Sequence, residues 1–541
     1  MGNTLVLFYQ NRVKKNWKIA FFSAFIIGML VHMYKFTNNF PFLDSYYNMY
    51  TSQDMLASGR WFLGVACSIS SYFDLPWLIG IISVFFIACT AAVVVEVFEI
   101  ESPCLIIVSA GLLVSYPAIT ETMFFEYTAD GYMIAMLLSA LSVYFSSIEK
   151  CQNWKNCGVS IVLLCLTCGI YQAYISFAFI LSVCYLMGQI LCERQQIHKQ
   201  LRWIACQILI YITALGLYYL IWKLRMHVSG ITANTYQGIS EMGGISVESV
   251  LSSVRRILQE FKMYLLERIP WHQGWTIYSA LNVMTCAAFG GIVLWAIVKR
   301  KIYRSPLELL LVMICVAAVP FGSYVIYFIS PGVNYCARML QSVVLMFIFT
   351  GVLFDRLVTV RYKDFVLLLL TAVLINNALM ANICYTHMHR FYEKSSATMS
   401  EIAARIHMED DGQVKYVAFM GMLDPMDEDA DIDNSQLGMV GPLKLVSKTQ
   451  ILYHEHIYLF LSQYTEFTLS YYRSTGELFP KQEISQNAPV PAGFEFRFPL
   501  SDEQHRYEVL SSPEVSAMGI WPSRDAVRRI GDTIVIKLSE G

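Results

Sequence analysis

Residues 19–62 read IAFFSAFIIGMLVHMYKFTNNFPFLDSYYNMYTSQDMLASGRWF, an apolar run followed directly by a polar, aromatic loop. The apolar run is long enough to cross the roughly 30 Å hydrocarbon core of a bilayer as a helix. Basic residues precede it between Arg12 and Lys18, and no small-residue cleavage pattern follows it. We therefore expect a retained transmembrane helix rather than a secretory signal. This helix would deliver the loop, residues 40–62, to one face of the membrane.

The composition of the chain is that of a polytopic membrane protein. Of its 541 residues, 56% are hydrophobic and only 15% are charged. The net charge is -2 and no basic excess is clustered, which argues against nucleic acid as a partner. Most of the 14 cysteines fall in apolar runs, where cysteine acts as a small apolar side chain, so we expect no disulfide framework.

A spanning helix needs about 20 apolar residues, and this criterion predicts about 11 spans. They are expected near residues 19–36, 75–97, 103–119, 131–147, 157–171, 173–192, 202–224, 278–298, 306–329, 338–354 and 364–384. The predicted fold class is mainly α, a polytopic transmembrane helix bundle. One point stays open, because residues 157–192 form either two helices that meet at YQAY or a bent pair of re-entrant character.

Basic residues predict the orientation of these spans, because lysine and arginine in short loops stay on the cytoplasmic side. With a cytoplasmic amino terminus, every strongly basic short loop falls on that side. The extracytoplasmic side then receives residues 37–74, 124–130, 225–277 and 329–338, and everything beyond residue 384. This orientation predicts a multi-pass protein with a cytoplasmic amino terminus and an extracytoplasmic C-terminal domain.

Beyond about residue 386 the composition changes to that of a soluble domain. Short strand-like runs occur at residues 415–421, 494–500 and 532–538, between charged segments. We predict two domains, a transmembrane domain over residues 1–385 and a small extracytoplasmic α/β domain over residues 386–541. The second is long enough to form a core of its own.

The loop in residues 40–62 carries the first candidate site residues. Asp44 lies just past a helix end and is suited to take a proton from an attacking sugar hydroxyl, although a helix cap would use the same carboxylate. Arg60 is suited to bind a phosphate bidentately, and Trp61 offers a flat face to a sugar ring. The alternative for this pair is a snorkelling arginine beside a tryptophan of the interfacial belt.

Two more polar groups fall on the same predicted face. The stretch YPAITETMFFEYTAD packs Glu121, Glu126 and Asp130 into one short turn with no basic partner nearby. Carboxylates that border lipid are costly, so we expect a cation, a ligand or an arginine from another loop beside them, unless the turn is a solvent-facing acidic loop. Tyr171 and Gln172 interrupt an apolar run, where they would bind sugar hydroxyls or link two helices.

Arg338 and His272 complete the set of candidates. Arg338 begins a span on the same predicted face and is a second candidate for the phosphate, with helix-end snorkelling as the alternative. His272, between two tryptophans in IPWHQGW, lines the site or belongs to an interfacial anchor. The sequence contains no P-loop, no nucleotide-binding G-x-G-x-x-G and no H-E-x-x-H, and its two H-x-H pairs are too isolated to predict a zinc site. We therefore expect a donor that is already activated in the membrane.

At these residues the chain resembles the type II glucosyltransferase family of bacterial polytopic membrane proteins, relatives of the enzymes that decorate O-antigen from a polyprenyl-phosphate sugar. The resemblance rests on the aspartate-bearing loop that ends in SGRWF, the acidic YPAITETMFFEYTAD turn, the GIYQAYISF stretch and the multi-span layout. It implies a GT-C type fold in the bacterial cytoplasmic (inner) membrane, with its active site on the extracytoplasmic face. It also implies an undecaprenyl-phosphate-linked hexose, such as glucose, as donor and a surface glycan as acceptor.

The resemblance assigns the general base to Asp44 and the lipid phosphate to Arg60 and Arg338. Relatives often carry adjacent acids in the first outer loop, whereas Ser45 follows Asp44 here. The second carboxylate is therefore expected to come from Glu126 or Asp130. A monophosphate leaving group does not require a metal, although the acidic turn leaves a divalent cation open. Two other functions stay open, a flippase or transporter of lipid-linked glycans and a polymerase with an arginine-rich outer loop.

Overall fold

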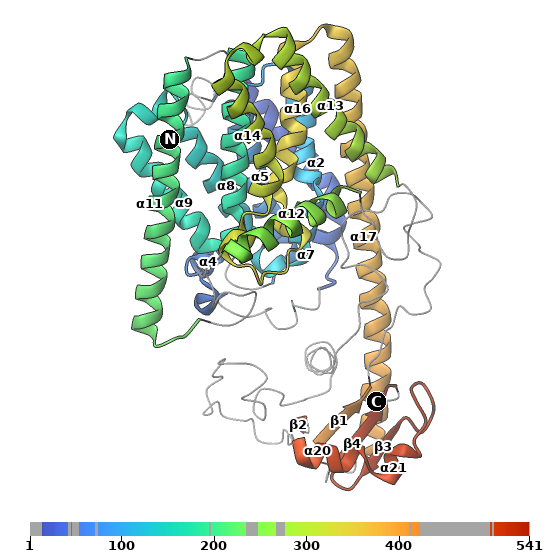
Figure 1. The fold of residues 1–541 in the computed structure, drawn as a ribbon. Helices are drawn as coiled ribbons and strands as arrows, with labels where there is room; N and C mark the ends of the chain where they lie inside the picture. The colour runs from blue at the N-terminus through green and yellow to red at the C-terminus, as the bar shows by residue number, and fades with distance from the viewer. Residues whose placement is uncertain are drawn as a thin grey trace, which may run out of the picture. The chain divides into compact units, whose positions relative to one another are not determined.

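The computed structural model describes residues 13–41, 45, 53–70, 74–193, 196–233, 247–266, 276–410, 414, 416–421, 498–499 and 503–539. Asp44 and His272 lie outside these ranges. The described residues form two compact units (Figure 1). The first contains the described residues up to 39 and from 53 to 385, and the second contains 40–41, 45 and those from 386 onward. The predicted boundary between residues 385 and 386 stays a prediction.

The first unit is helical. Its longer helices are α2 (Lys15–Thr37), α5 (Pro76–Val97), α6 (Pro103–Ser115), α7 (Pro117–Phe124), α8 (Glu126–Phe145), α9 (Trp154–Ile170), α10 (Ile175–Gly188), α11 (Ile197–Ser229), α12 (Val247–Leu266), α13 (Ile277–Lys299), α14 (Pro306–Ser323), α16 (Val344–Leu357) and α17 (Val360–Glu409), which continues into the second unit. Short helical segments connect them, namely η1 (Leu56–Ser58), α4 (Leu63–Cys67), η2 (Ser68–Ser70), η3 (Lys150–Gln152), η4 (Gln172–Tyr174), η5 (Gln189–Glu193), η7 (Ile302–Arg304), α15 (Ile326–Ile329), η8 (Ala337–Met339) and η9 (Gln341–Val343).

Within the described ranges, nine helical stretches are long and apolar enough to cross a membrane. One of them joins α6 to α7 and another joins η4, α10 and η5. The predicted spans near 157–171 and 338–354 correspond to α9 and α16, which have 17 and 14 residues and are shorter than a full crossing. The mainly helical fold class is confirmed, whereas the number of about 11 spans stays a prediction.

Two helices meet at the YQAY stretch, which is one of the two arrangements expected for residues 157–192. The α9 helix ends at Ile170, Tyr171 is extended, and η4 and α10 follow. The carbonyl oxygen of Gly169 accepts a hydrogen bond of 2.7 Å from the backbone N–H of Phe62. A distant loop therefore satisfies a carbonyl group at the end of α9, which helps this helix to stop inside the protein.

The acidic stretch is helical and buried, so the alternative of a solvent-facing acidic loop does not hold for this segment. Pro117 occupies the first turn of α7, and Tyr116 before it is extended, as the residue before a proline prefers. Phe125 breaks the helix once more, and α8 begins at Glu126. The side chains of Glu126 and Asp130 are only 3% and 0% exposed.

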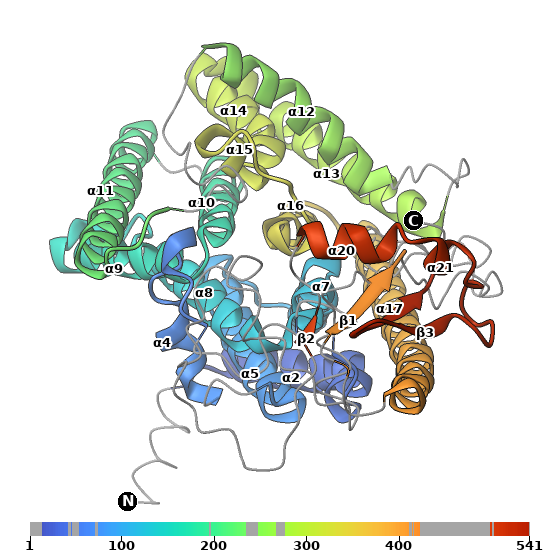
Figure 2. The same cartoon turned by 90° about the horizontal axis from the view of Figure 1, so that it is seen from below.

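Helices α2, α5 and α8 lie side by side, as Figure 2 shows in a view along the bundle. Large apolar side chains such as Leu30, Leu209 and Leu368 are more than half exposed on the outside of this unit. Such faces are expected where lipid rather than water surrounds a helix bundle.

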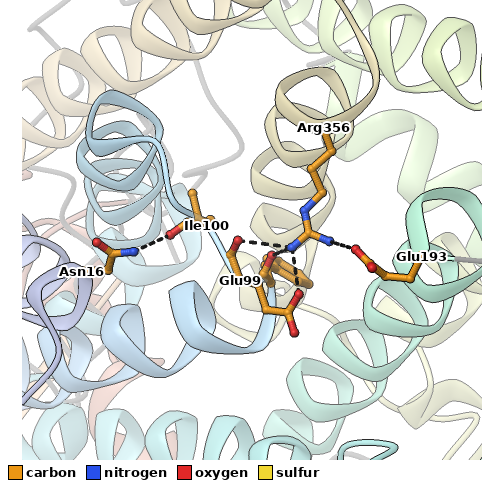
Figure 3. Close-up of polar contacts among 6 residues, drawn as sticks. Asn16, Glu99, Ile100, Glu193 and Arg356 are labelled. Carbon is orange, nitrogen blue, oxygen red and sulfur yellow. Dashed lines mark hydrogen bonds and ion pairs between the residues drawn. The ribbon is translucent and has the colours of Figure 1, made fainter.

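Arg356, near the end of α16, links the residues after α5 to η5, at the end of the bundle where α2 begins (Figure 3). Its guanidinium donates to the carbonyl oxygen of Phe98 at 2.6 Å, to the carboxylate of Glu99 at 3.2 Å and to that of Glu193 at 3.0 Å. At the same end, Asn16 donates to the carbonyl oxygen of Ile100. These contacts satisfy carbonyl groups after the end of α5, which the helix itself leaves without partners.

The described part of the second unit contains a small mixed sheet in the order β2-β1-β4-β3, formed by β1 (Tyr416–Met420), β2 (Phe498–Pro499), β3 (Val527–Ile530) and β4 (Thr533–Lys537), with α20 (Glu503–Leu510) and α21 (Pro513–Ser516). Strand β1 is parallel to β2 and β4, and β3 is antiparallel to β4. The three predicted strand-like runs contain β1, β2 and β4. The sequence did not predict β3, because its two arginines interrupt the apolar pattern.

Candidate active site

Polar contacts to the backbone hold residues 55–62 in place, and we call these residues the 55–62 loop. Gln172 donates to the carbonyl oxygen of Ser58 at 2.8 Å, and the Tyr218 hydroxyl donates to that of Gly59 at 3.2 Å. The indole N–H of Trp222 donates to Leu56 at 2.9 Å. Residues from η4 and α11 thus satisfy carbonyl groups that a tight loop cannot pair within itself.

Gly59 makes the sharp turn of this loop possible. Its φ is +79°, in the left-handed region that glycine adopts at little cost. A Cβ at this position would overlap the Tyr218 hydroxyl and lie 2.6 Å from the Gln172 amide nitrogen. The close approach and the backbone conformation both require glycine at the position directly before Arg60.

Arg60 points from the loop toward two stacked tyrosines. Its Nη1 donates to the Tyr132 hydroxyl at 3.1 Å, and its guanidinium carbon lies 4.4 Å from the centre of the Tyr171 ring. The two tyrosine rings are stacked with centroids 4.7 Å apart. Among the described residues its buried Nε has no hydrogen-bond partner, and Arg60 forms no ion pair with any of them.

Arg338, by contrast, has a buried carboxylate partner. The carboxylate of Glu121 accepts from the Arg338 backbone N–H at 2.9 Å and from its Nη1 at 3.3 Å. The Arg338 guanidinium lies 3.8 Å from the centre of the Phe125 ring. Arg338 is close enough to Arg60 and Tyr171 for an electrostatic interaction with each. We refer to Arg60, Arg338, Tyr132 and Tyr171 as the arginine cluster.

Glu126 faces a different cation. Its Oε1 lies 2.6 Å from Nζ of Lys35, and both side chains are buried. Asp74 interacts electrostatically with both residues, and its two carboxylate oxygens are buried without a hydrogen-bond partner among the described residues. We refer to Lys35, Glu126 and Asp74 as the lysine cluster. With one cation and two carboxylates, it is the acid-rich counterpart of the arginine cluster.

Burial raises the pKa of the Asp74 carboxyl to about 6, and the positive charge of Lys35 opposes part of this rise. An acid whose pKa is raised by folding stabilises the folded state most at low pH, and this contribution is lost as the pH rises through about 6. We expect wild-type protein to lose about 1 to 2 kcal/mol from this group between pH 5 and pH 8, and Asp74→Asn to lack this loss. Thermal unfolding of both proteins in detergent at pH 5, 6.5 and 8 measures it. A stability difference between the two that is the same at all three pH values would contradict the assignment.

Asp130 lies one turn after Glu126 on α8 and is fully buried. Its Oδ1 accepts from the backbone N–H of Gly131 at 2.8 Å, and its carboxylate interacts with the Ser70 hydroxyl and the Cys67 thiol. Asp130 therefore faces α4 and η2, which follow the 55–62 loop, rather than the arginine cluster.

The structure brings some of the predicted site residues together and separates others. Arg60 and Tyr171 are in contact, with Arg338 close by. Gln172 instead binds the backbone of the 55–62 loop, and Trp61 is 7% exposed and packs against Gly169. Asp44 and His272 fall outside the described ranges, so their placement stays a prediction.

A comparison with protein families adds an independent observation. The family model described as "Glucosyl transferase GtrII" matches residues 33–355, more than half of the chain. The chain belongs to the GtrII glucosyl transferase family. A comparison with curated proteins found no match.

The GtrII match confirms the family resemblance inferred from the sequence. Together with the nine apolar helical stretches of the described residues, it fits a multi-pass membrane glycosyltransferase. The matched range begins two residues before Lys35 and ends two residues before Leu357, the last residue of α16. It therefore includes both clusters and every predicted site residue of this GtrII family member.

Sequence reasoning did not select three residues of these clusters, namely Lys35, Asp74 and Tyr132. Lys35 carried a usable signal, because it is a charged residue inside the first predicted span, where a charge needs a partner. Asp74 and Tyr132 carried no such signal, because both lie near the ends of predicted spans, where polar residues are common. In the described parts of this GtrII family member, no group of three or more His, Cys, Asp or Glu side chains is arranged to hold a metal ion.

Proposed function

We propose that this GtrII family protein transfers a hexose, most simply glucose, from a polyprenyl-phosphate donor to a cell-surface glycan. The observation that carries the proposal is Arg60, whose guanidinium forms no ion pair within the described ranges. A cation in a largely buried position attracts an anion, and the phosphate of a lipid-linked sugar supplies one. Arginine matches phosphate geometry with two parallel N–H donors.

The aromatic residues around Arg60 suit the sugar part of such a donor. Tyr132 and Tyr171 present stacked rings beside the guanidinium, and Tyr174 lies 6.0 Å from Tyr171, centroid to centroid. Aromatic faces bind the apolar faces of sugar rings, while tyrosine hydroxyls bind the sugar's own hydroxyls. The site would therefore hold both the phosphate and the hexose of the donor.

In the proposed reaction, a hydroxyl oxygen of the acceptor attacks the anomeric carbon of the hexose. The bond from this carbon to the phosphate oxygen breaks, and the hydroxyl proton passes to a general base. On sequence grounds we propose Asp44 as this base, with Glu126 or Asp130 as the second carboxylate. Arg60, with Arg338, would stabilise the charge that develops on the departing lipid phosphate.

We further propose a GT-C type fold in the bacterial inner membrane, with the arginine cluster on the extracytoplasmic side. Lys14 precedes α2 and Lys35 lies near its end, while Arg338 precedes α16 and Arg356 lies near its end. The basic short loops and the two clusters therefore lie toward opposite ends of these helices. Because basic short loops stay in the cytoplasm, the clusters would face the other side.

Transfer from a lipid-linked donor tests the proposal directly. The full-length protein, reconstituted in vesicles with its glycan acceptor, is given undecaprenyl-phosphate glucose or a nucleotide-linked glucose, each radiolabelled. We expect label in the acceptor from the lipid-linked donor alone. Label from the nucleotide sugar alone, or from neither donor, would contradict the proposal.

The composition of the surface polysaccharide separates the alternative functions. We expect cells without the protein to make a polymer of normal length that lacks one side-branch sugar. A truncated or absent polymer would instead indicate a polymerase or a flippase.

A further inference from the structure

Lys35 is a buried cation that the proposed chemistry does not use. It lies near the C-terminal end of α2, and its side chain is 0% exposed. Its ion pair with Glu126 is also buried, and Asp74 places a second carboxylate nearby. Lys35 near the end of α2 and Glu126 at the start of α8 thus pair inside the helix bundle, and Asp74, just before α5, is close enough for an electrostatic interaction with both.

Stability alone is a weak reason for this arrangement. Removing two charges from water costs several kcal/mol for each ion, and replacing a buried ion pair with apolar residues is often neutral or stabilising. Moreover, Oε2 of Glu126 is buried and has no hydrogen-bond partner among the described residues. An unsatisfied buried acceptor costs about 1 to 3 kcal/mol, so its presence calls for a ligand that binds there.

The position of Glu126 connects the lysine cluster to the arginine cluster. Glu126 is the first residue of α8, directly after the break at Phe125. The Phe125 ring lies against the Arg338 guanidinium, and Tyr127, on the other side of Glu126, interacts electrostatically with Arg60. A shift of the backbone at Glu126 would therefore also move Phe125, which lies against Arg338, and Tyr127, which interacts with Arg60.

We infer that Lys35 is a positioning residue of the transfer reaction, which holds Glu126 through Oε1 and leaves Oε2 open to the bound substrate. The inference rests on the proposed function and deepens it, because it gives Glu126 a fixed orientation within the site. Lys35 itself touches neither the donor nor the acceptor in this arrangement.

Four variants of the full-length protein test the inference, namely Lys35→Met, Lys35→Arg, the double variant Lys35→Met with Glu126→Gln, and Lys14→Met as control. Lys35→Met leaves Glu126 buried without its cation, so we expect low abundance in the membrane. The double variant removes both charges, so its abundance should return to the wild-type level. Its kcat should nevertheless fall by about tenfold or more, while the KM for the lipid-linked donor stays within about twofold because Arg60 is intact.

The controls have defined expectations of their own. Lys35→Arg keeps the charge and should retain more activity than Lys35→Met. Lys14→Met removes a lysine whose ion pair with Glu96 is exposed on the lysine side, and it should leave abundance and kcat unchanged.

Two results would overturn the inference. A double variant with wild-type abundance and wild-type kcat would show that the ion pair is structural only. A double variant that fails to accumulate would show that the pair is needed for folding rather than for positioning. Both leave the proposed function intact, whereas a wild-type protein that cannot use the lipid-linked donor removes the function itself.

Discussion

Arg60→Gln is expected to lower kcat for transfer from the lipid-linked donor by about 100- to 1,000-fold, with abundance close to that of the wild type. Removing one preorganised donor to a developing negative charge typically has an effect of this size, about 3 to 4 kcal/mol. Abundance should hold because no described carboxylate is paired with Arg60, so the substitution leaves no buried charge uncompensated. Initial rates at several donor concentrations separate kcat from KM.

Two other arginines give matched comparisons. Arg338→Gln leaves the buried Glu121 without its cation, so this variant should lose abundance as well as activity. Arg304→Gln changes an exposed arginine in η7, at the other end of the bundle, and should change neither. An Arg60→Gln protein with wild-type kcat and KM would remove Arg60 from the donor site.

Gly59→Ala is expected to remove nearly all transfer activity and to destabilise the protein by about 2 kcal/mol or more. Part of the effect is backbone strain, because alanine at a φ of +79° costs about 1 kcal/mol relative to glycine. The larger part is steric, since the new Cβ would overlap the Tyr218 hydroxyl and crowd the Gln172 amide. Both groups hold the backbone next to Arg60, so the guanidinium would lose its placement.

Gly230→Ala separates the two contributions. Gly230, after the end of α11, has a similar φ of +66°, but a Cβ there would meet no described residue within 4 Å. This control should show the backbone cost alone, about 1 kcal/mol, with activity unchanged. Thermal unfolding in detergent and the vesicle assay measure both variants. Equal losses of stability and activity in the two would contradict a steric role for the contacts around Gly59.

The helical architecture was largely predictable because hydropathy is a local property. Each apolar run reports its own free energy of transfer into lipid, and no knowledge of its neighbours is needed. The runs around α2, α5 and α13 were placed within a few residues of their observed ends. The span predicted at residues 338–354 was less accurate, because α16 begins only at Val344 and the segments η8 and η9 precede it.

The candidate site was predictable in its residue types but not in its contacts. An arginine in the loop after the first span and acids inside an apolar stretch were visible because such residues are costly in lipid. A cation, a ligand or an arginine from another loop was expected beside the acids, and for Glu121 the partner is Arg338. The cation beside Glu126 proved to be Lys35, and Gln172 proved to hold a loop. No pattern in the sequence distinguishes these partners.

By itself, the sequence of this protein determined a membrane-embedded helix bundle, the GtrII family and a short list of polar residues whose burial in lipid is energetically costly. Each depends on the character of a single residue or of a single run. Only the tertiary structure decided that Glu121 lies beside Arg338, that Glu126 lies beside Lys35, and that Arg60 faces tyrosines rather than a described carboxylate. The energy of a buried charge depends on which distant segment packs against it, and that is a property of the whole fold.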